Sequence, residues 1–354
     1  MEGDYLIKFK IFKEPRFIYF DYLRIICCFF VIMIHVSFQY RRFNINSYEC
    51  KIAYFYDGIS RFSVPNFFMM SGTLFLKKDL SFKIIVRKYI KNILIHLLFW
   101  SMFYAFIGSK RQNIDIKIKI IQIIKGHYHL WYLFATIGLY ILIPFTKELI
   151  RNYKLFDILI AFNIIFLFII PNYIYIFRYY SQTLFALFND VFSMVSLNTL
   201  TVNNFYFIFG YYLNIKKGMK KELIIILYIA GLIGLFFTTI LSYNFSVTKK
   251  EKIMFFNPKN FNILFYSTGI FLLFKNHFNF TSKTKITQKL AKFTFGIYLI
   301  HPFIIERIIK KYNIFNFHLN TVLIIPIINL FIFLLSLIIC IILNYIPFIG
   351  KYLV

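Results

Sequence analysis

An arginine and a histidine stand eleven residues apart in an otherwise apolar stretch near the start of the chain. The stretch FDYLRIICCFFVIMIHVSF contains Asp21, Arg24 and His35. At about 100° per residue, the step from Arg24 to His35 returns to within about 20° of the same helix face, displaced by roughly 16 Å. Asp21, three residues before Arg24, suits an ion pair on that face. The spacing predicts a polar stripe along one apolar helix, and such a stripe indicates a functional site inside a membrane.

His35 is the residue of this stripe best suited to acid–base chemistry. A neutral imidazole can accept a proton from an alcohol at physiological pH, so His35 is a candidate general base for activating a hydroxyl. A structural alternative stays open for its neighbours, because Asp21 and Arg24 can also mark a membrane interface by extending their charged groups toward water.

Small and polar residues recur in a second apolar stretch, RFSVPNFFMMSGTLFL. Pro65 loosens a helix there, and Ser71-Gly72 permits another backbone to approach closely. Packing alone explains the Ser-Gly pair, since small residues in membrane helices usually serve helix contacts. Ser71 has no local base to activate it as a nucleophile, so we interpret it as a residue that lines a site.

Histidines also appear in two later apolar stretches. GHYHLW places His129 and Trp131 at the start of one, where an aromatic belt at the membrane interface would explain the tryptophan without any catalysis. FTFGIYLIHPFIIER places His301 before Pro302, with Glu306 and Arg307 following. A histidine bonded within its own helix beside a proline kink is the structural alternative for His301.

The composition indicates whether these residues lie in a soluble protein or in a membrane protein. The 354 residues are 60% hydrophobic and only 16% charged, and their mean hydropathy is +0.68, so a water-soluble globule is excluded as the main interpretation. Apolar runs of about 20 residues match the length of a transmembrane helix. The sequence therefore predicts an all-α, polytopic integral membrane helical bundle.

About ten transmembrane helices are expected from the apolar runs. The sixth is the least marked because it is short, and the longest connection, 177–203, is a candidate for a re-entrant or interfacial segment. The expected ranges are 18–38, 57–76, 89–108, 129–146, 155–177, 203–215, 222–243, 259–275, 293–310 and 320–346.

We interpret the positive charge of the chain as a signal that sets its orientation in the membrane. A net charge of +27 would suit nucleic acid, but Lys and Arg lie mainly in short connections, where they face lipid headgroups. Counting them on alternate sides favours cytoplasmic N- and C-termini, and the basic connection between the second and third expected helices contributes most. Its basic residues are Lys77, Lys78, Lys83, Arg87, Lys88 and Lys91.

The chain is expected to form one membrane domain over residues 1–354. It would begin with a short cytoplasmic tail, 1–17, and carry no appended soluble domain. The first apolar run contains charges and exceeds a signal-peptide core, so we expect it to be retained. The four cysteines show no CxxC pair, and neither a disulfide scaffold nor a metal site is indicated.

Four short motifs on separate expected helices together resemble the membrane-bound acyltransferase 3 family, whose members transfer acyl groups, commonly acetyl, to surface glycans and related acceptors. The resemblance covers most of the chain. Each motif alone is weak, whereas four in family order are specific. They are the first-helix Arg24 and His35, the FFxxSG element at Phe67, Phe68, Ser71 and Gly72, the His-x-Trp-x-Leu stretch at His129, Trp131 and Leu133, and the Tyr-Leu-x-His stretch at Tyr298, Leu299 and His301.

One family element departs from the usual pattern. The family often has Arg-x-x-Arg after the second helix, thought to meet the donor, whereas this chain has VRKYIKN, with Lys88 and Lys91 at the matching spacing and Arg87 adjacent. Lysine attracts phosphate as a point charge but lacks the planar fork of arginine. The resemblance still implies donor contact at these three residues.

The resemblance implies an enzyme in the plasma or inner membrane, with acetyl-CoA or another acyl-CoA as donor substrate and no tightly bound cofactor. His35 would act as general base on the acceptor hydroxyl or, as the less favoured role, carry the acyl group. Arg24, oriented by Asp21, would anchor the donor or stabilise oxyanion charge. The expected lining residues of the site are Ser71, Phe68, His129, Trp131, Tyr298 and His301.

Partners and competing functions follow from the same features. Membrane lipids, acyl-CoA and a glycan or lipid-linked glycan acceptor are the expected partners, nucleic acid is not, and the oligomeric state is left open. A transporter or flippase of lipid-linked glycans would also use buried charges in a helical bundle. A regulatory partner in a polysaccharide-synthesis complex is the third interpretation.

Overall fold

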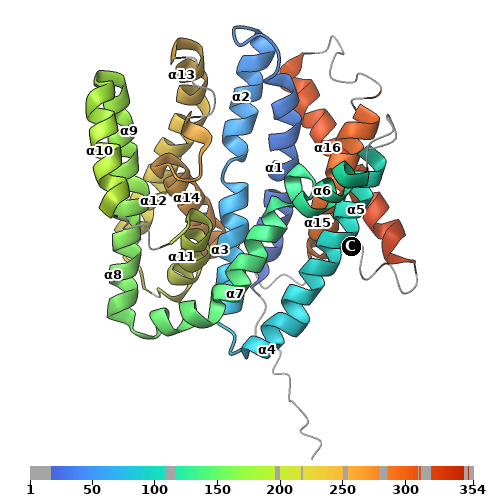
Figure 1. Cartoon of the computed structure of the whole chain (residues 1–354), viewed down its shortest axis with the longest axis horizontal. Helices are drawn as coiled ribbons and strands as arrows, with labels where there is room; N and C mark the ends of the chain where they lie inside the picture. Colours follow the sequence, from blue (N-terminus) through green and yellow to red (C-terminus); the bar gives the residue numbers. More distant parts are fainter. Residues whose placement is uncertain are drawn as a thin grey trace, which may run out of the picture.

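The computed structural model describes residues 17–108, 116–195, 200–216, 218–249, 254–278, 285–309, 311, 320–346 and 350. Within these ranges the chain is helical and contains no strand. Residues 1–16 of the expected N-terminal tail, residue 310 of the ninth expected helix and the last four residues lie outside the described part. Figure 1 shows α8, α9 and α10 at one edge, α5, α15 and α16 at the other, and α1 and α2 between them.

The α-helices have the following bounds: α1 Ile18–Tyr40, α2 Tyr48–Ser60, α3 Ser63–Leu76, α4 Phe82–Ile84, α5 Lys91–Gly108, α6 Ile116–Lys125, α7 Trp131–Arg151, α8 Tyr153–Asn163, α9 Ile170–Tyr180, α10 Gln182–Val195, α11 Val202–Ile215, α12 Lys221–Phe236, α13 Ser242–Lys249, α14 Phe261–His277, α15 Lys285–Ile304 and α16 Thr321–Asn344. Short stretches of π-helix or 3₁₀-helix continue or connect them: η1 Ile85–Ile90, η3 Tyr128–Leu130, η4 Ile164–Ile169, η5 Phe237–Leu241, η6 Met254–Phe256 and η7 Ile305–Ile309.

Six helical stretches in the described part are long and apolar enough to cross a membrane. The chain is therefore a multi-pass membrane protein, while the expected number of about ten spans is not confirmed. Several other expected spans correspond to shorter helices, such as α11, whose 14 residues extend only about 21 Å. The six stretches are Ile18–Tyr40, Phe82–Ile107, Ile116–Arg151, Tyr153–Tyr175, Lys221–Thr248 and Thr321–Asn344.

The second expected helix, 57–76, is two helices in the structure. α2 ends at Ser60 and α3 begins at Ser63. Pro65 is the third residue of α3, and its ring is incompatible with an uninterrupted helix through Arg61, four residues earlier. A proline is tolerated in the first turn of a helix, so the break falls just before it. This break places Arg61 at the junction between the two helices.

The long connection 177–203 is largely helical. α9 continues to Tyr180, and α10 packs against α9 to form a helical hairpin. α10 exposes an apolar stripe whose residues recur at helical spacing: Leu184, Leu187, Phe188, Val191 and Met194. A stripe of this kind on a membrane protein suits contact with lipid. Residues 196–199 of the connection lie outside the described part.

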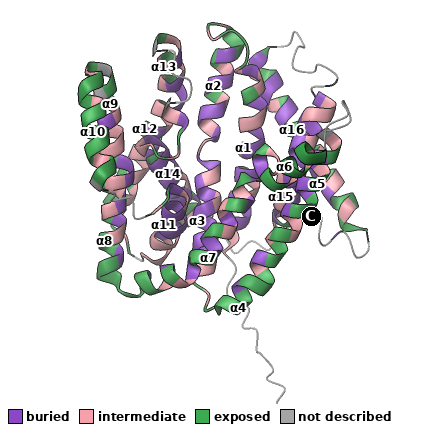
Figure 2. Cartoon of the chain, viewed as in Figure 1, coloured by how far each residue is buried: buried purple, intermediate pink, exposed green. Residues whose placement is uncertain are grey.

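Apolar side chains also cover the outside of the bundle on its longest helices. α16 exposes Leu323, Ile327, Leu330, Leu334 and Ile338 along one face. Figure 2 shows buried residues concentrated on the central helices and exposed residues on the outer ones. An apolar exterior around a buried centre is the arrangement that hydrocarbon favours, because lipid does not penalise exposed aliphatic groups.

α1 is the central helix of the bundle and packs against α2, α3, α14, α15 and α16. Beside it, α3 and α11 form the closest helix crossing. A Cβ added to Gly72 would overlap the carbonyl oxygen of Phe207, and one added to Gly210 would overlap the carbonyl of Met69. The close approach expected for the Ser-Gly pair is therefore present, and Gly72 is the member that provides it.

Candidate functional site

A cavity of about 460 Å³, hereafter the central cavity, lies between α1, α3, α7 and α15. Six of the expected site residues line it, and they come from four separate parts of the chain. These are Arg24, His35, Ser71, His129, Trp131 and Tyr298. Other lining residues include Cys28, Arg61, Tyr132, Thr136, Tyr140 and Thr294. The fold thus brings most of the expected site residues to one cavity.

The polar stripe on α1 faces this cavity. Arg24 and His35 both line it, separated by about three helical turns. Asp21 is buried, and its Oδ1 lies 3.9 Å from Nη1 of Arg24. The carboxylate is therefore placed to orient the guanidinium rather than to meet a substrate, and Asp21 is not among the residues that line the cavity.

α3 contributes Val64, Phe67 and Ser71 to the cavity wall and places Phe68 behind it. Ser71 lines the cavity, whereas the neighbouring Gly72 packs against α11. Phe68 is fully buried outside the lining, with its ring centroid 4.9 Å from that of Tyr132 and 6.3 Å from that of Trp131. Phe68 therefore supports two aromatic residues of the wall without contacting the cavity itself.

Histidines from three helical segments gather at the His35 end of the cavity. The ring centroid of His301 lies 5.2 Å from that of His35 and 5.7 Å from that of His129. The hydroxyl of Tyr298 donates a hydrogen bond to the backbone oxygen of His129, tying α15 to η3. His301 lies behind His35 rather than on the cavity surface. In the described part, this cluster does not form a group of metal ligands.

The cluster extends to two residues that were not on the expected site list. Nδ1 of His127 lies 2.8 Å from Nδ1 of His129, and Nε2 of His127 lies 3.3 Å from Oε1 of Glu306. The ring of Tyr104 stacks on His127 with centroids 4.2 Å apart. A carboxylate–imidazole–imidazole chain therefore runs from Glu306 to His129, and its contacts set which nitrogen of each ring carries a proton.

Two ring nitrogens at this end are buried without a hydrogen-bond partner among the described residues. They are Nε2 of His129 and Nε2 of His301. Leaving a buried polar atom unsatisfied costs about 1–3 kcal/mol, and His129, unlike His301, lines the central cavity, so its side chain marks a place where a substrate group can bond. The arrangement can place a base or a hydrogen-bond donor at the His35 end of the cavity.

Arg61 is a further lining residue that the expected site list did not include. In the structure Arg61 lines the central cavity. Its Nη2 lies 2.6 Å from Oδ1 of the buried Asp57, whose Oδ2 lies 3.0 Å from Nε of Arg41. The only sequence signal was the four-residue spacing of Asp57 and Arg61, which is typical of an ion pair on one helix.

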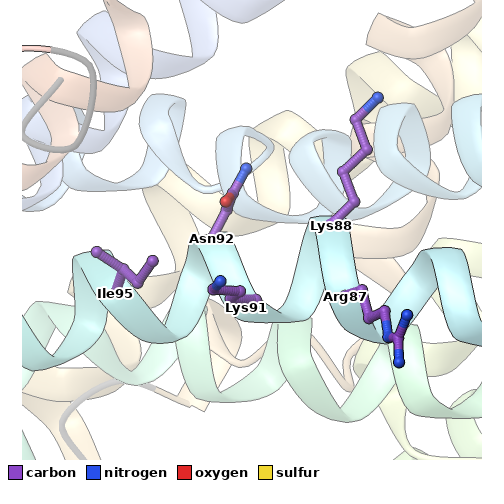
Figure 3. A pocket seen from close by; sticks show the side chains of 5 residues that line it. All are labelled: Arg87, Lys88, Lys91, Asn92 and Ile95. Carbon is purple, nitrogen blue, oxygen red and sulfur yellow. The ribbon is translucent and has the colours of Figure 1, made fainter.

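The three expected donor-binding residues share a second, open cavity of about 450 Å³, hereafter the basic cavity. It is lined by Arg87, Lys88, Lys91, Asn92 and Ile95, all from η1 and α5. Figure 3 shows Lys88 and Asn92 extending to one side of this helix and Arg87 to the other. The cations therefore form an exposed positive surface rather than a closed phosphate pocket.

An aromatic contact connects the basic cavity with the central one. Tyr89 lies between Lys88 and Lys91 in the sequence, and its ring centroid is 4.9 Å from that of Phe75 and 6.4 Å from that of Tyr140. Tyr140 lines the central cavity. Tyr89, Phe75 and Tyr140 thus form an aromatic layer where the η1–α5 helix meets the wall of the central cavity.

Comparison with known proteins agrees with this arrangement. Residues 17–345 match the family model described as an acyltransferase domain. The chain is 23% identical over 318 residues to the probable poly-beta-1,6-N-acetyl-D-glucosamine export proteins of Staphylococcus aureus strains MRSA252 and MSSA476, covering 83% of this chain and 84% of each relative. No solved structure matches significantly. The family match covers nearly the whole helical bundle, including every residue that lines the central cavity, and the chain therefore belongs to the acyltransferase 3 family.

Proposed function

We propose that this protein is a membrane-bound O-acyltransferase that transfers acetyl from acetyl-CoA to a hydroxyl of a cell-surface polysaccharide or its lipid-linked precursor. The observation that carries the proposal is the convergence of Arg24, His35, Ser71, His129 and Tyr298 on one cavity. The printed name of the staphylococcal relatives concerns a surface polysaccharide, which supports a glycan as acceptor. The protein would act in the plasma membrane with both termini cytoplasmic.

His35 acts as the general base in this proposal. The acceptor hydroxyl oxygen attacks the thioester carbonyl carbon while the imidazole takes the hydroxyl proton. Collapse of the tetrahedral intermediate breaks the C–S bond, and the proton passes to the leaving sulfur to give free CoA thiol. Transfer is direct, so no acyl group resides on the protein between donor and acceptor.

Arg24 and the histidine cluster surround the position where charge develops. The Arg24 guanidinium, oriented by Asp21, stabilises the oxyanion or holds the donor. Nε2 of His129 is the cluster atom best placed for the same purpose, because its other ring nitrogen already contacts His127. Tyr298 uses its hydroxyl to position the His129 backbone and therefore acts as a positioning residue.

Acetyl-CoA binds from the side of the basic cavity. The phosphates of CoA meet Arg87, Lys88 and Lys91 on the exposed surface of η1 and α5, while the pantetheine arm passes the aromatic layer toward the central cavity. Lysines attract phosphates by charge and not by a fixed bidentate geometry. CoA is a substrate here, and no resident cofactor is required.

The experiment that tests the proposal is transfer of label from radioactive acetyl-CoA to cell-envelope glycan by purified protein in lipid nanodiscs. Wild type should label the glycan, and His35→Ala should lose activity by at least about a hundredfold, as expected for loss of a general base. His277→Ala is the matched control, since His277 is exposed near the end of α14. Full transfer by folded His35→Ala would overturn the assignment.

Glycan export is the second candidate function, because the relatives' printed names concern export. An exporter would move polysaccharide into or out of proteoliposomes without consuming acetyl-CoA. Transport that persists in His35→Ala, with no CoA released by wild type, would favour export. CoA release that depends on both His35 and added glycan would favour acyl transfer.

A further inference from the structure

A third cavity of about 460 Å³, hereafter the outer cavity, adjoins the central cavity. The two share four lining residues, Ile34, Arg61, Val64 and Trp131. The remaining walls of the outer cavity come from α3, from the start of α11 and from the segment that runs from the end of η6 to α14. These walls comprise Pro65, Thr201, Val202, Asn203, Phe256, Asn257, Pro258 and Lys259. The shared residues make the two cavities neighbouring compartments of one site.

The lining of the outer cavity has the chemistry of a carbohydrate site. Asn203 and Asn257 offer amide donors and acceptors, Thr201 offers a hydroxyl, and the indole of Trp131 is 46% exposed. A broad aromatic face with a polar edge packs against the C–H face of a sugar ring, and the amides can bond its hydroxyls. Trp131 lies between both compartments and can therefore hold a ring next to the central cavity.

The charge of the outer cavity is positive. Arg61 and Lys259 line it, and no acidic side chain of the described residues does. Asp57 pairs with Arg61 but is shared with Arg41, so two guanidiniums face one carboxylate. α11 begins at the cavity wall, and its amino-terminal amides add partial positive charge. An occupant with a negative charge is favoured over a neutral one.

The walls are held in place by specific contacts. Phe256 lies under the Arg61 guanidinium, 4.5 Å from its ring centroid. The segment that carries Asn257 and Lys259 accepts hydrogen bonds at three backbone oxygens, from Tyr206 to Pro258 at 2.9 Å, from Asn262 to Phe255 at 2.8 Å and from Asn172 to Lys259 at 3.2 Å. Burying the Arg41–Asp57–Arg61 group costs desolvation energy. The group nevertheless keeps a positive charge beside the central cavity.

We propose that the outer cavity is the acceptor subsite and that it binds a sugar residue bearing a carboxylate or phosphate group. This inference rests on the proposed acyl transfer and names its substrate class. Lys259 and Arg61 bind the anionic group, Trp131 packs against the ring, and a hydroxyl of the same or the next sugar enters the central cavity toward His35. Donor and acceptor then approach from opposite ends of the central cavity.

The test measures binding separately from transfer. Two oligosaccharides of equal length, one containing glucuronate and the other glucose at the same position, are titrated into purified His35→Ala protein in nanodiscs of neutral lipid. The glucuronate compound should bind at least about tenfold more tightly, as a charge-assisted hydrogen bond permits. Lys259→Gln should remove most of this preference, and Lys259→Glu should reverse it. Lys220→Gln, at an exposed lysine before α12, should leave it unchanged.

The outcomes separate this inference from the proposed function. Equal binding of the two oligosaccharides, or a preference that survives Lys259→Glu in folded protein, would overturn the anionic subsite. Binding of glycerol phosphate as tight as that of the glucuronate oligosaccharide would show that the sugar rings contribute nothing and would indicate a lipid-headgroup site, which also overturns it. Loss of all transfer by wild type, with charge-selective binding intact, would refute only the acyltransferase assignment.

Discussion

His129 is the residue whose chemistry depends most on its neighbours. Nδ1 of His129 faces Nδ1 of His127, so one of the two nitrogens must donate and the other accept. Oε1 of Glu306 lies 3.3 Å from Nε2 of His127 and is placed to orient that ring. When Nδ1 of His127 is the donor of the pair, Nε2 of His129 carries a proton that it can offer to an oxyanion. Glu306 and His127 are thus positioning residues for His129.

Replacing the carboxylate should therefore slow the chemical step. We expect Glu306→Gln to lower kcat for glycan acetylation by about tenfold while the KM for acetyl-CoA stays within about twofold, because the lost interaction acts in the transition state. Steady-state kinetics of the purified protein measure both quantities. Glu222→Gln, at an exposed glutamate of α12, is the control.

A double variant distinguishes positioning from folding at the same residues. If Glu306 acts through His127, His127→Gln and Glu306→Gln together should cost no more than the larger single loss, because residues that act as a unit are not additive. Losses that multiply would show that the two residues act independently and would contradict the chain drawn from Glu306 to His129.

At the scale of elements, the site depends on where helices break and where they touch. The break between α2 and α3, beside Pro65, puts Arg61 at the boundary of the central and outer cavities. Two π-helical stretches coincide with candidate functional groups, since η1 carries Arg87 and Lys88 and η7 carries Glu306. Wider turns of this kind change the register of a helix and recur at functional sites.

The α3–α11 crossing gives a stability prediction. Gly72→Ala should destabilise the folded protein by about 3 kcal/mol, because the added methyl group meets the Phe207 backbone, which cannot move aside as a side chain can. The thermal midpoint in detergent, followed by fluorescence-detected gel filtration, should fall accordingly. Ser71 is displaced with the helix, so transfer should fall too.

Gly138 provides the matched control for this crossing. It lies within α7, and a Cβ placed there meets nothing within 4 Å. Gly138→Ala should leave the thermal midpoint unchanged or raise it, because alanine favours a helix by up to about 1 kcal/mol relative to glycine. Equal destabilisation by both substitutions would refute the role given to the close crossing.

For the whole molecule, the central and outer cavities both include residues of α1, and the basic cavity lies on a helix beside them. The central cavity extends along the polar stripe from Arg24, and Ile93 of α5, next in sequence to Asn92 of the basic cavity, is part of its wall. The outer cavity adjoins the other end of the polar stripe, next to His35. A donor with several phosphates and an acceptor on the cell surface can then react inside the bundle without either molecule crossing it.

This arrangement predicts that the basic cavity and the outer cavity open to opposite sides of the membrane. In sealed vesicles of known orientation, a membrane-impermeant maleimide should label Lys259→Cys from outside and Lys91→Cys only from the cytoplasmic side. The four native cysteines, Cys27, Cys28, Cys50 and Cys340, are buried and should give little background. Labelling of both positions from the same side would contradict the prediction that the two cavities open to opposite sides of the membrane.

The basic cavity predicts how donor affinity depends on charge. The double substitution of Lys88→Gln and Lys91→Gln should raise the KM for acetyl-CoA by about tenfold with little change in kcat, because exposed point charges contribute to binding and not to chemistry. The same KM should rise with salt in wild type and less so in the variant. Lys154→Gln, at an exposed lysine of α8, serves as control.

Much of the helical organisation was predictable because it is local. The apolar run at 18–38 corresponds to α1, and the angular argument that placed Arg24 and His35 on one face holds, since both line the central cavity. The family assignment from four short motifs is confirmed by the match over residues 17–345. The roles of the site residues and the acetyl-CoA donor stay predictions.

Other features follow only from contacts between helices. The meeting of His127 with Glu306, the sharing of Asp57 by two arginines and the existence of the outer cavity join residues that no sequence period relates. The number of membrane spans likewise cannot be predicted from apolar runs alone. A short helix such as α11 has apolar residues because they are buried against α3, and the helix does not have the length that crosses a full bilayer. The sequence by itself determined a helical membrane protein of the acyltransferase 3 family with a polar stripe on α1. Only the tertiary structure decided which other side chains join that stripe to form a site. The reason is that the distances between these side chains depend on how segments far apart in the sequence pack together.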